Sequence, residues 1–558
     1  MSDEKKQLDS PPVESVDPND HEREQQQDQD LPEVRGQVPR KVWLVQGLYF
    51  LERAAFYGLS QPLQNYLQLS KDDPHRPGAL GLGQSRAVMI VYIWFIYSYL
   101  TPLAGGLIAD CWLGRRKTIQ VGFFIYVLGL AIVTATAFTE RLHGVGGLPG
   151  FIVGMFLVGA GTGTVKPNIT VFLIDQFPDT GEEPKTVTLK DGKLAKVSRE
   201  LTIRFIWNVN YWMINVGGLC GIITTNIERY AHVAGFGFAF MVCLILVMAS
   251  TLIFNITYKK FEIIPPSGNA VADTIAALRR RRLQKKASRD TTPAAAQETK
   301  AVSAGSSDAS SQSAAEDGTI TTQAAKDLSV LRDAKTALRA CLVFLPFPAL
   351  MLSINLMDST LIAQAGTMQT NGLPNDIMYN LNPISVMVFL PLFQSWIYPS
   401  LSKRKVNFSP EHRIGVGMFC ATLAIAYTTG IQHLVYSTGP CFSHPLACLA
   451  GKNVPNDVSV GYQTPTYVFL AWGEILAIVS GTELAYSRAP ASMKSIVQAL
   501  FHFFSAMGSV FGVAVSFACH DPNMVIVYGA ITAFLLLCTV GFEASYFVRR
   551  KKTGSGTV

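Results

Sequence analysis

Five charged side chains stand inside apolar runs of this sequence, where a membrane-spanning helix would hold them away from water. Glu52 and Arg53 are adjacent in the middle of one run, and other runs contain Lys166, Asp358 and Glu474. A charged residue at the centre of a spanning helix costs about 2.5–3.5 kcal/mol on insertion scales. Such residues persist when they pair with each other or face a water-filled cavity, so we interpret them as a functional set.

The types of these residues suit the binding of a dipolar molecule. If Glu474 lay opposite the cations Lys166 and Arg53, the site would carry charges of both signs. Lysine loses its proton readily when it is desolvated, so Lys166 near Glu52 would form a pair whose protonation depends on occupancy. The structural alternative is a static ion pair that holds helices together.

The composition of the 558-residue chain is typical of a polytopic membrane protein. Hydrophobic residues make up 49% of the chain and charged residues 16%, with a mean hydropathy of +0.25. The net charge of +7 does not predict a nucleic-acid partner, because the basic residues lie in short segments between apolar runs. The nine cysteines have no metal-ligand spacing, and the apolar runs contain no HExxH or GxSxG motif, so we expect neither a metal site nor an enzyme.

Twelve apolar runs are each long enough to cross a bilayer, which takes about 20 residues. They predict an all-α membrane protein whose twelve transmembrane helices form two six-helix bundles. The predicted spans are 42–67, 86–109, 118–139, 149–175, 203–225, 234–258, 337–361, 380–402, 411–434, 464–487, 496–519 and 523–548.

Basic residues concentrate in alternate connections between these runs, including Arg115–Lys117, Arg279–Arg282, Lys403–Lys405 and Arg549–Lys552. By the positive-inside rule, these connections and both termini are cytosolic. The acidic, Gln-rich N-terminal segment lacks the basic and apolar regions of a cleaved signal peptide. We therefore expect the first apolar run to direct the chain to the membrane.

The chain divides in two at RRRRLQKK and the Ala/Ser/Thr/Gln-rich stretch after it, which has no face that could pack and is expected to be flexible. Two six-helix halves joined by a long cytosolic loop indicate a secondary transporter with its binding site between the halves. The expected parts are a disordered cytosolic tail (1–40), an N-terminal bundle (41–258), the cytosolic linker (259–335), a C-terminal bundle (336–548) and a cytosolic tail (549–558).

The non-cytosolic connection 435–463 contains Cys441 and Cys448. They form either a disulfide, which that compartment permits, or two free thiols. The glycosylation-like sites at Asn168, Asn255 and Asn407 lie in a span, at a span end and in a cytosolic loop, so we do not expect them to be glycosylated.

The segment GLIADCWLGRRK (106–117) resembles the signature loop of the major facilitator superfamily. Its first glycine permits close helix approach, and Asp110 can meet an arginine or a helix N-terminus at the cytosolic face. We expect Asp110, Arg115 and Arg116 to act in gating. The alternative is an ordinary basic loop with a chance aspartate.

Five further segments are similar to the proton-coupled oligopeptide transporters within that superfamily, in family order and at family spacing. The fourth is similar to fungal members. The segments are ERAAFYG (52–58), GAGTGTVKPNITVFLIDQF (159–177), YWMINVGGL (211–219), QAGTMQTNGLPNDIMYNLNP (364–383) and ELAYSRAPASMKSIVQALF (483–501).

The resemblance implies a role for each matched residue. Cations of the first half face the substrate carboxylate, a glutamate of the tenth span receives the amino group, and asparagines bond the peptide backbone. The implied substrate-binding residues are Arg53, Tyr57, Tyr99, Lys166, Asn215, Asn382 and Glu474. The implied proton-coupling residues are Glu52, Lys166 and Asp358, of which Asp358 serves an extracellular gate or a proton relay, while Glu483 serves an inter-helix bond or a gate.

The sequence departs from the family motif at Tyr49, where the motif has a glutamate that takes part in proton coupling, and at Ala54, where it has phenylalanine. A tyrosine with an ordinary pKa near 10 cannot replace that glutamate at neutral pH. Either Glu52 and Asp358 carry the proton alone, or coupling is weakened or lost.

We therefore predict a secondary transporter of di- or tripeptides or peptide-like compounds that works by alternating access and is coupled to protons. The alternatives are an exporter of a peptide-like metabolite, a carrier of another small solute, and a peptide sensor that does not transport. We expect no cofactor besides the proton gradient, a plasma-membrane location, the bilayer and a small peptide as partners, and function as a monomer.

Overall fold

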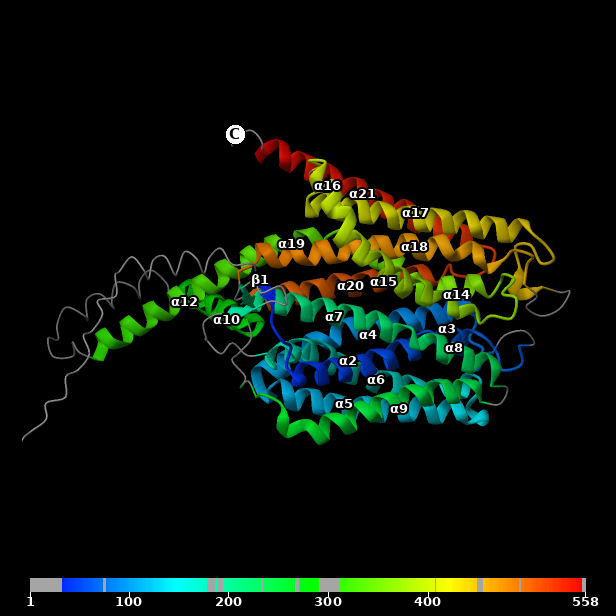
Figure 1. Cartoon of the computed structure of the whole chain (residues 1–558), viewed down its shortest axis with the longest axis horizontal. Helices are drawn as coiled ribbons and strands as arrows, with labels where there is room; N and C mark the ends of the chain where they lie inside the picture. Colours follow the sequence, from blue (N-terminus) through cyan, green and yellow to red (C-terminus); the bar gives the residue numbers. More distant parts are fainter. Residues whose placement is uncertain are drawn as a thin grey trace, which may run out of the picture.

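The computed structural model describes residues 33–73, 77–177, 186–188, 194–231, 234–263, 265, 270–290, 312–406, 408–448, 455–490 and 493–553. Long helices run side by side along one axis, and short loops join them at both ends (Figure 1). The expected tail 1–40 lies almost wholly outside the described residues, as does part of the expected linker.

The first half is built from helices that occupy the first six predicted runs. Two of these runs are each covered by two helices with a short break, the first by α2 and α3 and the fifth by α7 and α8. The helices are α2 (Arg40–Ser60), α3 (Leu63–Gln68), α4 (Gln84–Ile108), α5 (Arg115–Phe138), α6 (Leu148–Asp175), α7 (Arg199–Gly218), α8 (Cys220–Tyr230) and α9 (Gly235–Thr257).

The second half occupies the remaining six runs, and three of them change helix type partway along. Short 3-10 turns break the seventh run, whereas π-helical segments interrupt the eighth and tenth. Its elements are α13 (Phe347–Asn355), η6 (Leu356–Asp358), α14 (Thr360–Ala365), η7 (Asn375–Asn380), α15 (Leu381–Leu392), η8 (Phe393–Ile397), α16 (Tyr398–Lys403), α17 (Pro410–Ser437), α18 (Thr464–Gly473), η11 (Glu474–Val479), α19 (Ser480–Arg488), α20 (Lys494–Ser516) and α21 (Met524–Thr553).

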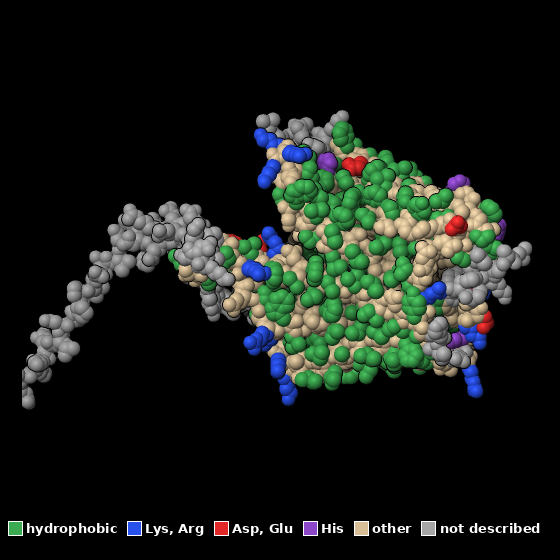
Figure 2. Space-filling view, turned by 45° about the vertical axis from the view of Figure 1, so that its right-hand side comes forward, with side chains coloured by type: hydrophobic (Ala, Val, Ile, Leu, Met, Phe, Trp, Pro, Cys, Tyr) green, Lys and Arg blue, Asp and Glu red, His purple; other side chains and the backbone are tan. Residues whose placement is uncertain are grey.

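Among the described residues, 9 helices are long and apolar enough to cross a membrane, or up to 10 when the bent pair Ala325–Phe344 and Phe347–Asp358 counts as one span. The first and fifth predicted spans are also helical, but their helices contain too many polar residues to count as apolar enough in this sense. Hydrophobic side chains cover the flank of the bundle, and Lys and Arg side chains lie at its ends (Figure 2). Each predicted run is therefore helical, as a twelve-span fold requires.

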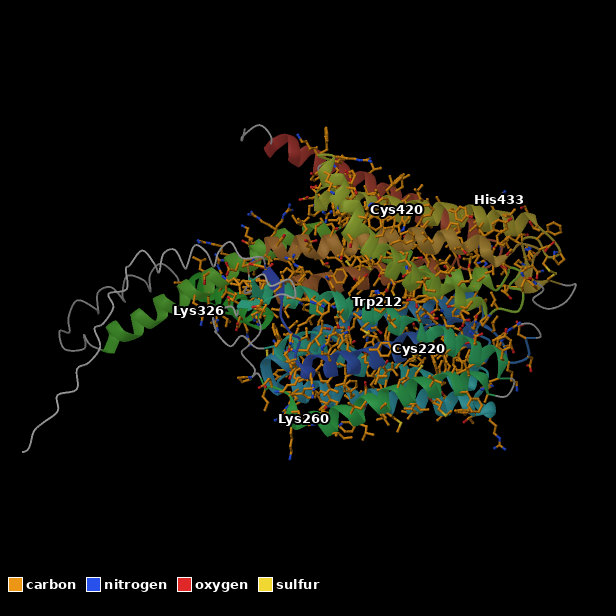
Figure 3. All side chains as sticks on the ribbon, viewed as in Figure 1. Trp212, Cys220, Lys260, Lys326, Cys420 and His433 are labelled. Carbon is orange, nitrogen blue, oxygen red and sulfur yellow. A yellow bond between two sulfur atoms is a disulfide. The ribbon has the colours of Figure 1, made fainter. Side chains whose placement is uncertain are left out.

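The two ends of the bundle differ. One end carries the disulfide between Cys441 and Cys448, so of the two alternatives for these cysteines the structure has the bonded one. We call this end of the bundle the disulfide end. The opposite end, which we call the terminal end, carries the last described residues of the chain and the helices of the linker. Lys260 lies near the terminal end and His433 toward the disulfide end (Figure 3).

Two helices lie within the stretch that was predicted to be a flexible linker. They are α10 (Ala270–Asp290) and α12 (Gln312–Ala340), and Arg280 binds Asp327 through two hydrogen bonds of 2.8 Å that join them. These two helices flank the Ala/Ser/Thr/Gln-rich stretch, most of which lies outside the described residues.

A three-stranded sheet lies at the terminal end of the first half. Strand β3 (Leu194–Ser198) pairs in parallel with β1 (Glu33–Arg35) and antiparallel with β2 (Thr186–Thr188). The backbone N–H of Gly36 donates to the Thr202 hydroxyl at 2.8 Å, so the start of α2 is held against α7.

Glycines bring α6 close to its neighbours. A side chain at Gly161 would meet the backbone of Tyr126 on α5 at 2.6 Å, and one at Gly163 would meet Thr101 on α4 at 2.0 Å. Such small residues let membrane helices approach without a gap. The close approach on these two sides positions Thr162 and Lys166 of α6 on the wall between the halves.

Candidate functional site

A cavity of about 140 Å3 lies between the two halves, lined by helices α2, α4, α6 and α7 of the first half and by α13, η6, η7, α15 and η11 of the second. Aromatic rings, asparagines and three charged groups share its wall. The predicted site residues that line it are Tyr57, Tyr99, Lys166, Asn215, Asp358, Asn382 and Glu474.

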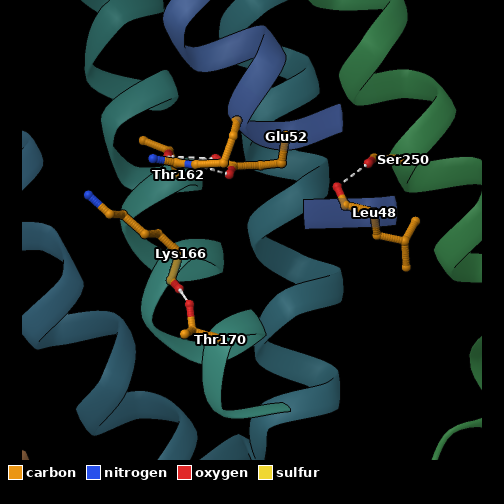
Figure 4. A network of polar contacts seen from close by, with 7 residues as sticks. Leu48, Glu52, Thr162, Lys166, Thr170 and Ser250 are labelled. Carbon is orange, nitrogen blue, oxygen red and sulfur yellow. Dashed lines mark hydrogen bonds and ion pairs between the residues drawn. The ribbon is translucent and has the colours of Figure 1, made fainter. Parts of the chain in front are cut away.

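Glu52 and Arg53 lie behind this wall and bind each other. The Arg53 guanidinium donates to both carboxylate oxygens of Glu52, each at 2.5 Å, and both side chains are buried. Thr162 accepts from Arg53 at 2.9 Å and donates to Glu52 at 2.8 Å (Figure 4). Arg53 therefore cannot make its predicted contact with a substrate carboxylate in this arrangement, because Thr162 separates the Glu52–Arg53 pair from the cavity.

Lys166 lies one turn beyond Thr162 on α6 (Figure 4). The following residue, Pro167, lies inside the helix and has no N–H to give to the carbonyl of Gly163. Among the described residues, no hydrogen bond or ion pair holds the Lys166 ammonium. It is the cation that the first half presents to the cavity, ready to bind an anionic group of a ligand.

Asp358 stands at a break in the seventh predicted span. The chain leaves helical geometry at Ser359, whose φ is −140° and ψ −95°, between η6 and α14. The Ser60 hydroxyl of α2 lies within hydrogen-bonding reach of the Asp358 carboxylate. Broken helices at the interface of two halves are where transporters place substrate and ion sites.

Glu474 begins the π-helical segment η11 in the middle of the tenth predicted span. Such segments are rare and often occur at functional sites. Asn382 of α15 donates to Glu474 at 3.4 Å. This carboxylate therefore faces the cavity from the second half, with Lys166 on the wall of the first.

The neutral polar residues complete the wall. Tyr99 donates to the Asn355 side chain at 3.3 Å, and Asn215 donates to the Tyr211 carbonyl at 2.9 Å. The ring of Tyr57 lies 6.5 Å from that of Tyr379 across the two halves. A dipolar ligand can thus meet opposite charges at its two ends and hydrogen-bonding groups and rings between them.

Comparison with known proteins agrees with this geometry. A family model described as "POT family" matches residues 116–531. The "Probable peptide transporter ptr2" of Schizosaccharomyces pombe is 33% identical over 90% of this chain and 78% of its own length, and the "Peptide transporter PTR_C" of Candidozyma auris is 33% identical over 93% and 86%. The chain belongs to the POT family.

The fold agrees with this assignment. The crystal structure of the POT family transporter PepTSo has a TM-score of 0.68 and 19% identity, over 93% of this chain and 99% of that one. At this identity the likeness establishes the fold alone, and the two halves of helices described above agree with it.

In this POT family chain, Tyr49 is buried beside the Glu52–Arg53 pair. The Arg53 guanidinium lies over the Tyr49 ring at 5.4 Å and over the Phe56 ring at 4.7 Å. The position at which the family motif has a glutamate therefore supplies an aromatic face to the Arg53 cation, and the Glu52–Arg53 pair is balanced without a second acid.

The loop that resembles the superfamily signature forms an ion-pair cluster at the terminal end. Arg115 donates to both oxygens of Asp175 at 2.9 Å and lies 3.6 Å from Asp110. Arg116 donates to the Tyr258 carbonyl at 3.2 Å. The sequence singled out three of these groups for gating but missed Asp175, which ties the loop to the end of α6. Glu483 lies apart from them, exposed on α19.

Several contacts close the transporter at the disulfide end by joining its two halves. Asn65 and Asn375 exchange two hydrogen bonds of 2.9 Å, and Gln61 and Asn380 exchange two of 3.3 and 2.8 Å. These residues were not predicted. The amides are common residue types whose pairing across more than 300 positions leaves no sequence signal.

Two buried carboxyl groups also meet at this closure. Glu228 of α8 and Asp376 of η7 face each other within hydrogen-bonding reach, and Asn65 donates to Glu228 at 3.1 Å. One oxygen of Glu228 and both of Asp376 are buried without a donor among the described residues. Burial and the nearby Asp376 carboxylate raise the pKa of Glu228, against the lowering effect of Arg229, so we expect the two carboxyl groups to share one proton in this closed arrangement.

Proposed function

We propose that this protein moves short peptides across a membrane by alternating access, coupled to protons. The observation that carries the proposal is the cavity between the halves, where Lys166 of one half and Glu474 of the other offer opposite charges. A peptide is a zwitterion, and its two ends match these charges. The similarity to peptide transporters over most of the chain supports the same substrate class.

In this mechanism Lys166 binds the peptide carboxylate and Glu474 its amino group, while Asn215 and Asn382 bond the backbone. These groups come from both halves, so a bound peptide joins the halves across the cavity. The coupling proton is taken up by the carboxylate set, at Glu52 or Asp358. A proton on Glu52 would release Arg53, which could then reach the cavity beside Thr162.

We also propose that the disulfide end is extracellular, because disulfides form in oxidising compartments. Both termini are then cytosolic, in agreement with the basic residues of the terminal end. The described closure at Asn65 and Asn375 would be the extracellular gate. We expect the protein to lie in the plasma membrane and to work as a monomer, with the proton gradient in place of a cofactor and without enzymatic activity.

Uptake of radiolabelled alanyl-alanine into proteoliposomes of the purified full chain tests the proposal. We expect uptake when the outside is acidic and its loss when a protonophore collapses the gradient. Glu474→Gln should reduce it strongly, whereas Asp457→Asn, which changes an exposed carboxylate outside the cavity, should not. The absence of any peptide uptake would overturn the proposal, and uptake that ignores the gradient would overturn its coupled form.

A further inference from the structure

The charges around the cavity do not balance. The charged groups that line it, among the described residues, are the cation Lys166 and the two carboxylates Asp358 and Glu474. Glu52 and Arg53 add nothing to the balance, because they neutralise each other behind the wall. In the described residues neither Asp358 nor Glu474 has an ion-pair partner. The site therefore holds one negative charge in excess.

The surroundings of Asp358 do not remove this excess. Burying an unpaired carboxylate is costly, so the group needs a cation or a proton when water is excluded from the cavity. The groups that face it are neutral or negative: the Ser60 hydroxyl, the Glu474 carboxyl and the hydroxyls of Tyr57, Tyr92, Tyr99, Tyr379 and Tyr467.

A peptide with neutral side chains leaves this carboxylate unmatched. Its carboxylate balances Lys166 and its ammonium balances one acid, so the other acid still needs a positive charge. A lysine or arginine side chain on the peptide would supply it. The rings of Tyr57, Tyr99 and Tyr379 beside Asp358 suit such a side chain, because they can hold its apolar stem and attract its cation.

We propose that the cavity selects short peptides with one basic side chain, whose cation takes the place beside Asp358 that a proton fills when a neutral peptide is bound. This rests on the proposed function. It follows that a basic peptide crosses with one proton fewer than a neutral peptide. The balance is the same whether the proton of the neutral case resides on Asp358 or on Glu52, because the whole set contains three carboxylates and two cations.

The test compares alanyl-alanine with alanyl-lysine in proteoliposomes of the full chain, with the membrane potential clamped at zero so that substrate charge does not itself drive flux. We expect initial uptake of the neutral peptide to rise about tenfold as the external pH falls over a range in which the basic peptide changes less than about twofold. The basic peptide should also show the lower half-saturation concentration at neutral pH.

The variant Asp358→Asn removes the excess charge. Uptake of the neutral peptide should then lose its pH dependence, and the half-saturation concentration of the basic peptide should rise at least about tenfold, the lower end of what close charge pairs contribute. Asp457→Asn is the matched control, for which both responses should stay as in the unmodified chain.

The outcomes separate the two proposals. If neither peptide is transported, the proposed function fails. If both are transported with the same pH response, the function stands and the inference is overturned. The inference is also overturned if the Asp358→Asn variant still shows different pH responses for the neutral and the basic peptide. Should Asp358→Asn fail to fold, the comparison of the two peptides in the unmodified chain decides alone.

Discussion

Arg53 binds both carboxylate oxygens of its own sequence neighbour, Glu52, at 2.5 Å. Adjacent residues of a helix usually point in different directions, since each step turns about 100°. Here the long side chain of Arg53 folds back so that its guanidinium reaches Glu52, and Thr162 of α6 forms a hydrogen bond with each of the two residues. The two charges that are most conspicuous in the sequence are thus satisfied by each other, and in the described part of the chain Lys166 is the cation that lines the cavity.

Thr162→Val should loosen this pair. The change removes one donor and one acceptor from two buried charged groups, and a hydrogen bond to a charged group contributes about 1.5–3 kcal/mol. We expect a lower apparent melting temperature of the purified protein and reduced peptide uptake. Thr164→Val is the control, because the Thr164 hydroxyl bonds a carbonyl of its own helix. Equal melting temperatures for the two variants would contradict the role of Thr162.

Tyr49→Glu places a carboxylate where the Tyr49 ring now faces Arg53. The new acid would share that cation with Glu52, so acidification outside must protonate one of the two before Arg53 can move. We expect uptake to depend more steeply on external pH than in the unmodified chain. Glu52→Gln should flatten the dependence and also destabilise the protein, by about 3–5 kcal/mol, since it leaves a buried guanidinium without its partner. An unchanged pH profile for Tyr49→Glu would argue against proton coupling through this pair.

A proton shared by Glu228 and Asp376 should make closure of the disulfide end sensitive to pH. The closed state binds the proton, so acid should favour closure and alkali should favour opening. Asp376→Asn replaces the shared proton with an amide donor. This variant should therefore keep the disulfide end closed in both acid and alkali. Spin labels at Lys71 and Asn371, two exposed positions on opposite halves, report the distance by double electron–electron resonance. A pH response that persists in Asp376→Asn would refute the assignment.

Arg115→Gln should weaken the terminal end. It leaves the largely buried Asp175 carboxylate without its bidentate donor, at a cost of about 1–3 kcal/mol. We expect a lower apparent melting temperature and slower uptake. Lys117→Gln removes the same charge from an exposed neighbour and should have little effect, as isolated surface charges contribute about 0–1 kcal/mol. If both variants behave alike, the loop acts through its net charge and not through the Asp175 contact.

The sequence by itself determined which stretches are helical and which charged residues lie within them. Both follow from local chemistry, because a bilayer requires long apolar runs and makes each interruption by a charge conspicuous. The predicted runs are accordingly all helical in the structure, and Asp358 and Glu474 stand where those helices break or widen. The flexibility of the Ala/Ser/Thr/Gln-rich stretch stays a prediction, because most of it lies outside the described residues; α10 and α12 on its two sides pair through Arg280 and Asp327.

The tertiary structure alone decided which of these charges face the cavity. Arg53 and Lys166 are equally conspicuous in the sequence, yet one is sealed behind Thr162 and the other lines the wall. The same holds for Glu228 and Asp376, which meet only because α8 and η7, from opposite halves, pack against each other. Such choices depend on helix rotation and packing between halves, and those are set by many contacts distributed over the whole chain.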